Sequence, residues 1–234
     1  MFQRARSEEQ REARRQAILA AAAAMLTEMP VADVTLNELS RRSGLAKSNV
    51  LRYFESREAV LLELLDAAWR DWLGQLDEDL PGAAGSGAAG SGPAGTGPAG
   101  RGRALATALA ASLAARPMLC DLLSAQAAVL ERNVSPQVAA QYKRASIAGI
   151  DALGRLVRRC LPELGEPDAA RLAGATVLMT AALWPHTHPS AAMLAAYEAD
   201  PELAAMRLDF TATLREVLEV MSAGLLARSG RDSR

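Results

Sequence analysis

Apolar residues recur at helical spacing in the first thirty residues of the chain. Ile18, Ala22, Met25 and Met29 follow the pattern i, i+4, i+7, i+11, which places all four on one face of a helix. The stretch "SEEQ" beginning at Ser7 matches a helix capping box, and Pro30 favours a helix end. The pattern therefore predicts a first helix over about residues 8–28.

The segment "VTLNEL" carries the signals of a second helix start. Thr35 and Glu38 have the spacing of a capping box, and Val34 and Leu39 supply the apolar pair that flanks such a cap. Gly44 follows, and glycine adopts the left-handed conformation that ends a helix without steric cost. We therefore expect a short helix that begins at Thr35 and ends in a tight turn.

A third and a fourth helix are predicted after this turn. Val50 and Phe54 are four residues apart and mark a core face, while Ser48, Asn49 and Arg52 project elsewhere. Ser56 is a suitable cap for the fourth helix, which is expected to end near residue 80. Its apolar stripe consists of Val60, Leu61, Leu64, Leu65, Ala68 and Trp72.

The apolar periodicity stops at residues 81–102, which contain nine glycines. Such a segment has nothing to bury against the entropy of ordering, so we expect a flexible linker without a functional role. Beyond it, helices are expected at about residues 103–115, 117–132, 136–160, 168–184 and 202–228, separated by prolines.

Composition agrees with an all-α protein. Half of the residues are hydrophobic, Ala and Leu are abundant, and aromatic residues make up 4%. The expected organisation is a helix-turn-helix domain with the start of the connecting helix (1–60), the rest of that helix (61–80), the linker (81–102), a helical bundle (103–228) and a disordered tail (229–234).

Charge and two apolar runs add limited information. Residues 1–60 carry ten basic and eight acidic side chains, a balance that only permits an anionic partner. The runs 17–26 and 172–197 resemble a signal peptide and a membrane span. Acidic residues before the first run and "PHTHP" inside the second favour helices of a protein without a membrane segment.

Two short helices around a glycine turn, with an apolar pair on one side and Ser, Asn and Arg on another, are typical of a helix-turn-helix. The recognition helix would begin near Lys47 and enter the major groove of double-stranded DNA. An ordinary helical hairpin with solvated charges remains the alternative, because helix spacing alone does not exclude it.

The run "TLNELSRRSGLAKSNVLRYFESREAVL" resembles the TetR family of bacterial transcriptional regulators, and the resemblance covers about residues 8–66. Leu51, Ala46 and Arg57 depart from the residues usual in the family. The resemblance implies base-edge or phosphate contacts by Lys47, Ser48 and Asn49. It also implies phosphate contacts by the four residues Thr35, Arg52, Tyr53 and Arg57.

The resemblance further implies a homodimer formed by C-terminal helices and a pocket for a small-molecule effector. Phe210, Leu214, Val217, Met221 and Leu225 form a helical stripe suited to an interface, although a monomer's core shows similar stripes. The candidate pocket residues are Trp69, Met118, Gln126, Tyr142, Met179, Trp184, His186 and His188. Each of them also suits an ordinary core position.

No metal or cofactor is expected. His186 and His188 lie two residues apart between prolines, which is weak evidence for a metal site even with Cys160 as a third ligand. No nucleotide-binding or nucleophile-elbow motif occurs, so an enzyme is not favoured. The expected function is a cytoplasmic bacterial regulator, most often a repressor, released from its operator by an effector. The alternatives are an effector-independent DNA-binding protein and a small helical enzyme.

Overall fold

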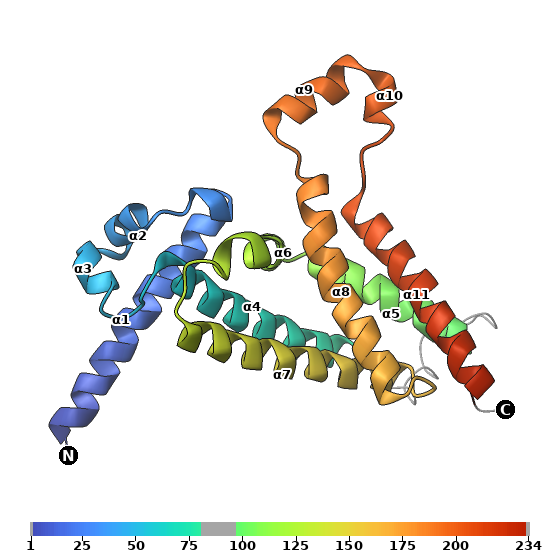
Figure 1. The fold of residues 1–234 in the computed structure, drawn as a ribbon, viewed down its shortest axis with the longest axis horizontal. Coiled ribbons are helices and arrows are strands. Elements are labelled where there is room, and N and C mark those ends of the chain that lie inside the picture. The colour runs from blue at the N-terminus through green and yellow to red at the C-terminus, as the bar shows by residue number, and fades with distance from the viewer. Residues whose placement is uncertain (1, 81–96, 233–234) are drawn as a thin grey trace. The chain divides into compact units, whose positions relative to one another are not determined.

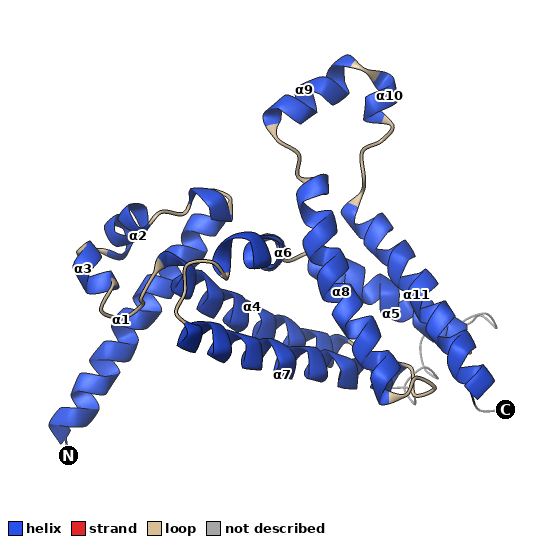
Figure 2. Ribbon diagram, viewed as in Figure 1, coloured by secondary structure: helices blue, strands red, loops and turns tan. Residues whose placement is uncertain are grey.

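The computed structural model describes residues 2–80 and 97–232, and within these ranges the chain forms helices and no strand (Figures 1 and 2). The chain divides into two compact units. Unit 1 comprises Met1–Ala68 and Asp121–Ser146, and unit 2 comprises Trp69–Cys120 and Ile147–Arg234. The all-α prediction is confirmed.

Unit 1 begins with the helix-turn-helix region predicted from the sequence. Its elements are α1 (Phe2–Leu26), η1 (Val31–Asp33), α2 (Leu36–Ser43), α3 (Lys47–Val50) and the first part of α4 (Arg57–Asp79). Ile18 and Met25 of α1 are fully buried, as are Leu39 and Val50 from α2 and α3. Removal of these apolar surfaces from water is the main force that holds such short helices in place, because α3 alone has only four residues.

The local signals around α2 are confirmed. The hydroxyl oxygen of Thr35 accepts a hydrogen bond from the Glu38 amide at 3.2 Å, so Thr35 is the N-cap. Gly44 has φ of 68°, the left-handed conformation that L side chains rarely adopt. The turn between α2 and α3 is therefore encoded locally by the sequence.

The first helix differs from the prediction at its start. Helix α1 already begins at Phe2, so Ser7 lies inside the helix instead of capping it. A capping box and an ordinary helix interior can have the same sequence, because the polar residues that cap helices also occur on exposed helix faces. The predicted face with Ile18, Ala22 and Met25 is nevertheless the buried one.

Residues 121–146 belong to unit 1, although we assigned them to a separate C-terminal domain of residues 103–228. This segment contains the end of α6 (Pro117–Ala125), the π-helical η2 (Gln126–Leu130) and the start of α7 (Pro136–Cys160). The Val31 amide donates to the Asp121 carboxylate at 3.0 Å, and the Ser135 amide donates to the carboxylate of Glu55. These contacts join residues distant in sequence, which sequence periodicity does not reveal.

Unit 2 is built around three helices: α5 (Pro98–Ala114), α8 (Glu166–Thr187) and α11 (Phe210–Asp232). Helix α11 packs against both α5 and α8 (Figure 1). The predicted linker 81–102 is too long at its C-terminal end, because α5 begins at Pro98 and Gly102 is buried. A β-carbon at Gly102 would lie 3.1 Å from the Ser222 hydroxyl of α11, so glycine here permits close helix packing. The rest of the predicted linker, residues 81–96, lies outside the described residues.

The C-terminal predictions need two further corrections. Helix α11 continues to Asp232, so residues 229–232 are helical and not a disordered tail; Ser229 donates to the Leu225 carbonyl at 3.1 Å. The expected helix over 202–228 is interrupted: α10 (Pro201–Ala204) is followed by the non-helical residues 205–209, and α11 begins at Phe210. Before α10 lies the separate helix α9 (Ala191–Ala199). Neither α9 nor α10 has a buried residue.

Candidate nucleic-acid interface

The recognition helix presents its polar residues to solvent. Lys47 and Ser48 are exposed at the start of α3, Asn49 is partly exposed, and Val50 on the other side is buried. Ala46 precedes the helix without a side-chain cap. The structure thus brings the three predicted base-reading side chains onto one short exposed turn of helix.

The predicted phosphate residues have different surroundings. Arg52 is exposed and Tyr53 is partly exposed directly after α3. The Thr35 hydroxyl is used as the cap of α2, which leaves it at a helix N-terminus where an anion is favoured.

Arg57, for which a phosphate contact is predicted, also has contacts within the protein. Its Nη1 donates to the Val34 carbonyl at 2.7 Å, and its Nε donates to the Glu58 carboxylate at 3.1 Å. Glu58 is buried, and Arg57 joins it at the start of α4 to Val34, the residue before the N-cap of α2. The role was missed because the backbone carbonyl that it binds is distant in sequence.

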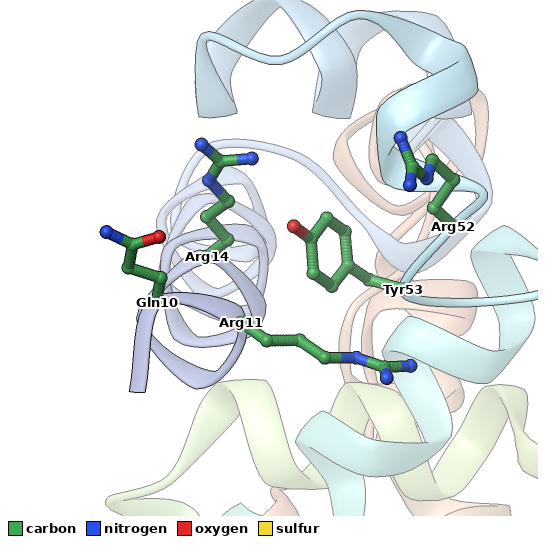
Figure 3. Close-up of a pocket in the computed structure, with 5 residues that line it drawn as sticks. All are labelled: Gln10, Arg11, Arg14, Arg52 and Tyr53. Carbon is green, nitrogen blue, oxygen red and sulfur yellow. The ribbon is translucent and has the colours of Figure 1, made fainter. Parts of the chain in front are cut away.

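A pocket opens between α1 and the end of the recognition region, that is, residues Arg52 and Tyr53 directly after α3. Its volume is about 350 Å³, and Gln10, Arg11, Arg14, Arg52 and Tyr53 line it. Figure 3 shows Gln10 and Arg14 on the side of α1 and Arg52 and Tyr53 on the other side, while the Arg11 side chain extends from α1 below Tyr53. Sequence reasoning missed Gln10, Arg11 and Arg14. The signal was present, since five arginines precede the apolar run of the first helix.

Arg15, the next residue of α1, holds the backbone beside this pocket. Its guanidinium bonds both carboxylate oxygens of Glu63 in α4 and donates to the Tyr53 carbonyl at 3.1 Å. It also lies over the ring of Phe54, 4.4 Å from the ring centre, a cation–π arrangement. Arg15 therefore connects α1, the end of the recognition region and α4.

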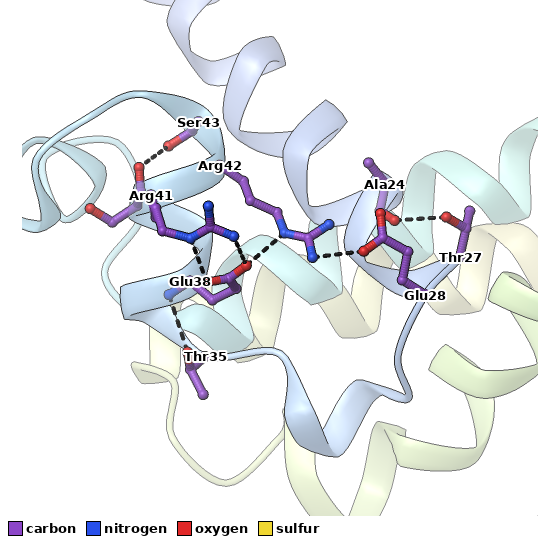
Figure 4. A network of polar contacts seen from close by, with 9 residues as sticks. Ala24, Thr27, Glu28, Thr35, Glu38, Arg41, Arg42 and Ser43 are labelled. Atoms are coloured by element: carbon purple, nitrogen blue, oxygen red, sulfur yellow. Dashed lines mark hydrogen bonds and ion pairs between the residues drawn. The ribbon is translucent and has the colours of Figure 1, made fainter.

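The arginines of α2 are neutralised by glutamates (Figure 4). Arg41 and Arg42 both bond the carboxylate of Glu38, and Arg42 also bonds Glu28 at 2.7 Å. The hydrogen bonds from Arg41 and then Arg42 lower the pKa of Glu38 to about 2. Glu38 thus remains ionised and screens the charge of both arginines.

The predicted effector residues are divided between the two units. Gln126 and Tyr142 belong to unit 1, where Gln126 donates to Glu131 at 2.8 Å and burial raises the pKa of Tyr142 to about 12. The remaining candidates, Trp69, Met118, Met179, Trp184, His186 and His188, belong to unit 2.

In unit 2, Trp184 and His188 are brought together. Their ring centres are 3.9 Å apart, and the ring of Phe210 meets that of Trp184 edge to face with centres 5.0 Å apart. This contact fastens the end of α8 to the start of α11, which favours a packing role for Trp184. His186 is exposed and Met179 and Met118 are partly buried. Within the described residues, no three His, Cys, Asp or Glu side chains are grouped so that they could hold a metal ion.

Trp69 is the candidate with an unsatisfied polar atom. Its side chain is buried, and its ring meets that of Trp72 edge to face with centres 4.8 Å apart. The indole N–H has no hydrogen-bond partner among the described residues, and neither does the buried hydroxyl of Thr180. Buried polar atoms without partners are uncommon in native proteins, so both atoms call for an explanation.

The apolar stripe of α11 serves mainly the core of its own chain. Phe210, Leu214 and Leu225 are buried, whereas the exposed large apolar residues of α8 and α11 are Leu178 (71% exposed) and Val220 (69%). The other two residues of the predicted stripe, Val217 and Met221, are partly exposed. Three of the five residues therefore pack within the protomer, and the predicted dimer interface stays a prediction.

Comparison with families and known proteins places both parts of the chain. The model of bacterial regulatory proteins of the tetR family matches residues 18–64, and the model of tetracyclin repressor-like C-terminal domains matches residues 66–229. The regulator EthR of Mycobacterium tuberculosis is 44% identical over 50 residues, which is 21% of this chain and 23% of that protein. The matched region is thus about a quarter of the length of that relative.

Solved structures share the fold over nearly the whole chain. A possible TetR family regulator from Streptomyces coelicolor is 22% identical, with a TM-score of 0.53 over 91% of this chain and 98% of the other. FadR from Bacillus subtilis, solved with stearoyl-CoA, is 12% identical, with a TM-score of 0.53 over 89% and 98%. No single helix of the described ranges is long and apolar enough to cross a membrane; α5 taken with the segment Pro117–Leu130 passes only as a bent pair, by length and composition.

The N-terminal helix-turn-helix, the helical remainder and the two matching models agree over residues 18–64 and 66–229. The chain belongs to the TetR family of bacterial regulatory proteins.

Proposed function

We propose that this protein binds an operator in double-stranded DNA as a homodimer and represses transcription in the bacterial cytoplasm until a small molecule releases it. The observation that carries the proposal is the exposed polar start of α3, with Lys47, Ser48 and Asn49 held on a left-handed glycine turn. A short helix with this surface suits insertion into the major groove.

The three side chains offer different contacts to base edges. Lysine donates to the O6 and N7 acceptors of guanine, and asparagine pairs with the N6 and N7 atoms of adenine. Serine bonds either donors or acceptors. Lys47 and Asn49 are therefore proposed to select bases, while Arg52 and Tyr53 contact the phosphate backbone of the DNA.

Dimerisation is proposed through the faces of α8 and α11 that the protomer leaves open. Leu178 and Val220 are exposed there, and the neighbouring exposed residues Ala182, Ala223 and Gly224 are small enough for close helix approach. A dimer of two copies related by a twofold axis would bury Leu178 and Val220 of each copy. The resulting operator is expected to be nearly palindromic.

An effector is proposed to bind in unit 2. The support is two of the three buried polar atoms that have no hydrogen-bond partner within the described residues, the Trp69 indole N–H and the Thr180 hydroxyl; the third is Nε of Arg159. A bound molecule that accepts a hydrogen bond from the indole would satisfy that donor. FadR of Bacillus subtilis shows that a protein of this fold holds a ligand, stearoyl-CoA in that case.

The proposal is tested by selecting the duplexes that the protein binds from a random pool. Compounds are then screened for those that release the protein from the duplex it binds most tightly. Lys47→Ala and Asn49→Ala should each change which sequences are recovered, because each lost bidentate contact removes about 1–3 kcal/mol of base discrimination. Recovery of a single unpaired half-site by a monomer would refute the dimeric operator. Binding that no compound releases would favour an effector-independent protein.

A further inference from the structure

The arginines of residues 8–68 fall into two groups. Four of them bond a glutamate, namely Arg15, Arg41, Arg42 and Arg57. The other three, Arg11, Arg14 and Arg52, are exposed and have no ion pair within the described residues. All three members of this second group line the pocket between α1 and the end of the recognition region (Figure 3).

The acidic residues Glu8, Glu12 and Glu55, which are near these arginines in sequence, form no ion pair with them within the described residues. Glu12 lies between Arg11 and Arg14 in sequence, but its carboxylate accepts a hydrogen bond from the Gln16 amide at 2.7 Å. The other lining residues, Gln10 and Tyr53, are uncharged. The pocket therefore has three positive charges on its lining and no negative one.

The chemistry of this lining suits a phosphate group. A guanidinium presents a planar fork of N–H donors that matches two phosphate oxygens, and amide and phenol groups add neutral donors. Phosphate carries its charge on oxygens that accept from several directions, and a volume of about 350 Å³ has room for it and for a neighbouring sugar.

The two sides of the pocket are held relative to each other before any ligand binds. Arg15 of α1 donates to the Tyr53 carbonyl at 3.1 Å and stacks on Phe54, so it holds the backbone that carries Arg52 and Tyr53 against α1. A site that is ordered in advance loses less entropy when its ligand binds.

We propose that Arg11, Arg14, Arg52 and Tyr53 form a phosphate-binding pocket, which gives α1 a direct share in ligand binding. The phosphate is that of a DNA backbone, in which case the inference rests on the proposed function, or that of a free phosphorylated small molecule. The contact is independent of base sequence in both cases. It differs from the proposed role of α3, which selects bases.

The first arm of the test is a salt titration of duplex binding by the double variant Arg11→Gln/Arg14→Gln. One phosphate contact per protomer is two per dimer, so the slope of log K against log salt should become shallower by about 1.8. Affinity should fall by the same factor for the operator and for a scrambled duplex. The matched control is Arg144→Gln/Arg155→Gln, which removes the same charge from exposed positions on α7 and should leave the slope unchanged.

The second arm uses inorganic phosphate and the free protein. Phosphorus NMR line broadening is followed at fixed ionic strength for the parent, the double variant and Arg52→Gln. Saturable phosphate binding that both variants lose, with an unchanged salt slope, would identify a free phosphorylated ligand as the source. Circular dichroism confirms that each variant is folded, which is expected because all three arginines are exposed.

The inference is overturned if folded variants keep both the parental salt slope and the parental phosphate binding. It is also overturned if they change sequence preference and keep the slope, since the arginines would then read bases. A parent protein that selects no duplex would remove the proposed function, while the phosphate titration would still decide whether the pocket exists.

Discussion

The arginines of α2 and those that line the α1 pocket have the same chemistry and belong to the same unit, yet their electrostatic situations are opposite. Arg41 and Arg42 follow Glu38 by three and four residues, and on a helix this spacing brings the carboxylate against both guanidinium groups. Arg11 and Arg14 are three residues from each other, and Glu12 between them bonds Gln16. Spacing alone does not decide the outcome, because Glu8 precedes Arg11 by three residues and no ion pair joins the two within the described residues. The arginines that remain available to an anion are those whose neighbouring carboxylates are not turned towards them.

The comparison is tested most strongly by replacing one paired and one unpaired arginine of the same helix. Arg15→Ala removes two bonds to Glu63, the bond to the Tyr53 carbonyl and the stacking on Phe54. We expect the free energy of unfolding to fall by about 2 kcal/mol, the usual size for hydrogen bonds to a charged group. Denaturant unfolding measures the change.

Arg14→Ala, one residue away, is the matched control for this substitution. It should leave the free energy of unfolding within about 0.5 kcal/mol of the parent, because Arg14 is exposed and forms no ion pair within the described residues. Equal destabilisation by the two substitutions would contradict the division into paired and unpaired arginines.

The second test makes the paired arginines of α2 available to an anion. Glu38→Gln removes the carboxylate that Arg41 and Arg42 share, while Glu28 still bonds Arg42. We expect DNA affinity at low salt to rise by about threefold and the salt slope to steepen by up to about 0.9 for each new phosphate contact. Fluorescence anisotropy with a labelled duplex at several salt concentrations measures both quantities.

Glu198→Gln on α9 changes the net charge by the same amount in unit 2 and serves as the control. It should leave the salt slope unchanged. If both variants strengthen binding equally, net charge is responsible and the pairing on α2 is irrelevant to DNA affinity.

The smallest expected effect concerns pH. Arg41 and Arg42 depress the pKa of Glu38 from 4.5 to about 2, so this group stabilises the folded state fully above pH 4.5. Its contribution is lost as pH falls from 4.5 towards 2. The difference in melting temperature between the parent and Glu38→Gln should therefore shrink over this range, as thermal unfolding followed by circular dichroism would show. A difference that grows on acidification would contradict the assigned sign.

Sequence patterns predicted the parts of the fold that depend on near neighbours. The Thr35 cap and the Gly44 turn are local, since each is decided within a few residues. The role of Arg57 and the assignment of residues 121–146 to unit 1 depend on contacts with Val34 and Val31, which are distant in sequence. Periodicity carries no information about such partners.

The candidate site follows the same division. The polar start of the recognition helix was predicted, because Lys47, Ser48 and Asn49 are adjacent in sequence. The α1 side of the pocket was missed, because the sequence does not show that Arg11 and Arg14 lie close to Arg52 and Tyr53 in the fold. The predicted starts of α1 and α5 were also wrong. A polar sequence at the start of α1 and a glycine-rich one at the start of α5 do not prevent a helix that tertiary packing stabilises.

The segment between α8 and α11 has a consequence for the integrity of the polypeptide. Helices α9 and α10 bury no residue, and five large apolar side chains are exposed on and just after them: Met193, Leu194, Leu203, Met206 and Leu208. Proteases cut most readily where backbone is accessible and weakly packed. Because α11 packs against both α5 and α8, the two fragments of a cut chain would remain associated, and continuity of the backbone here is not needed to hold unit 2 together.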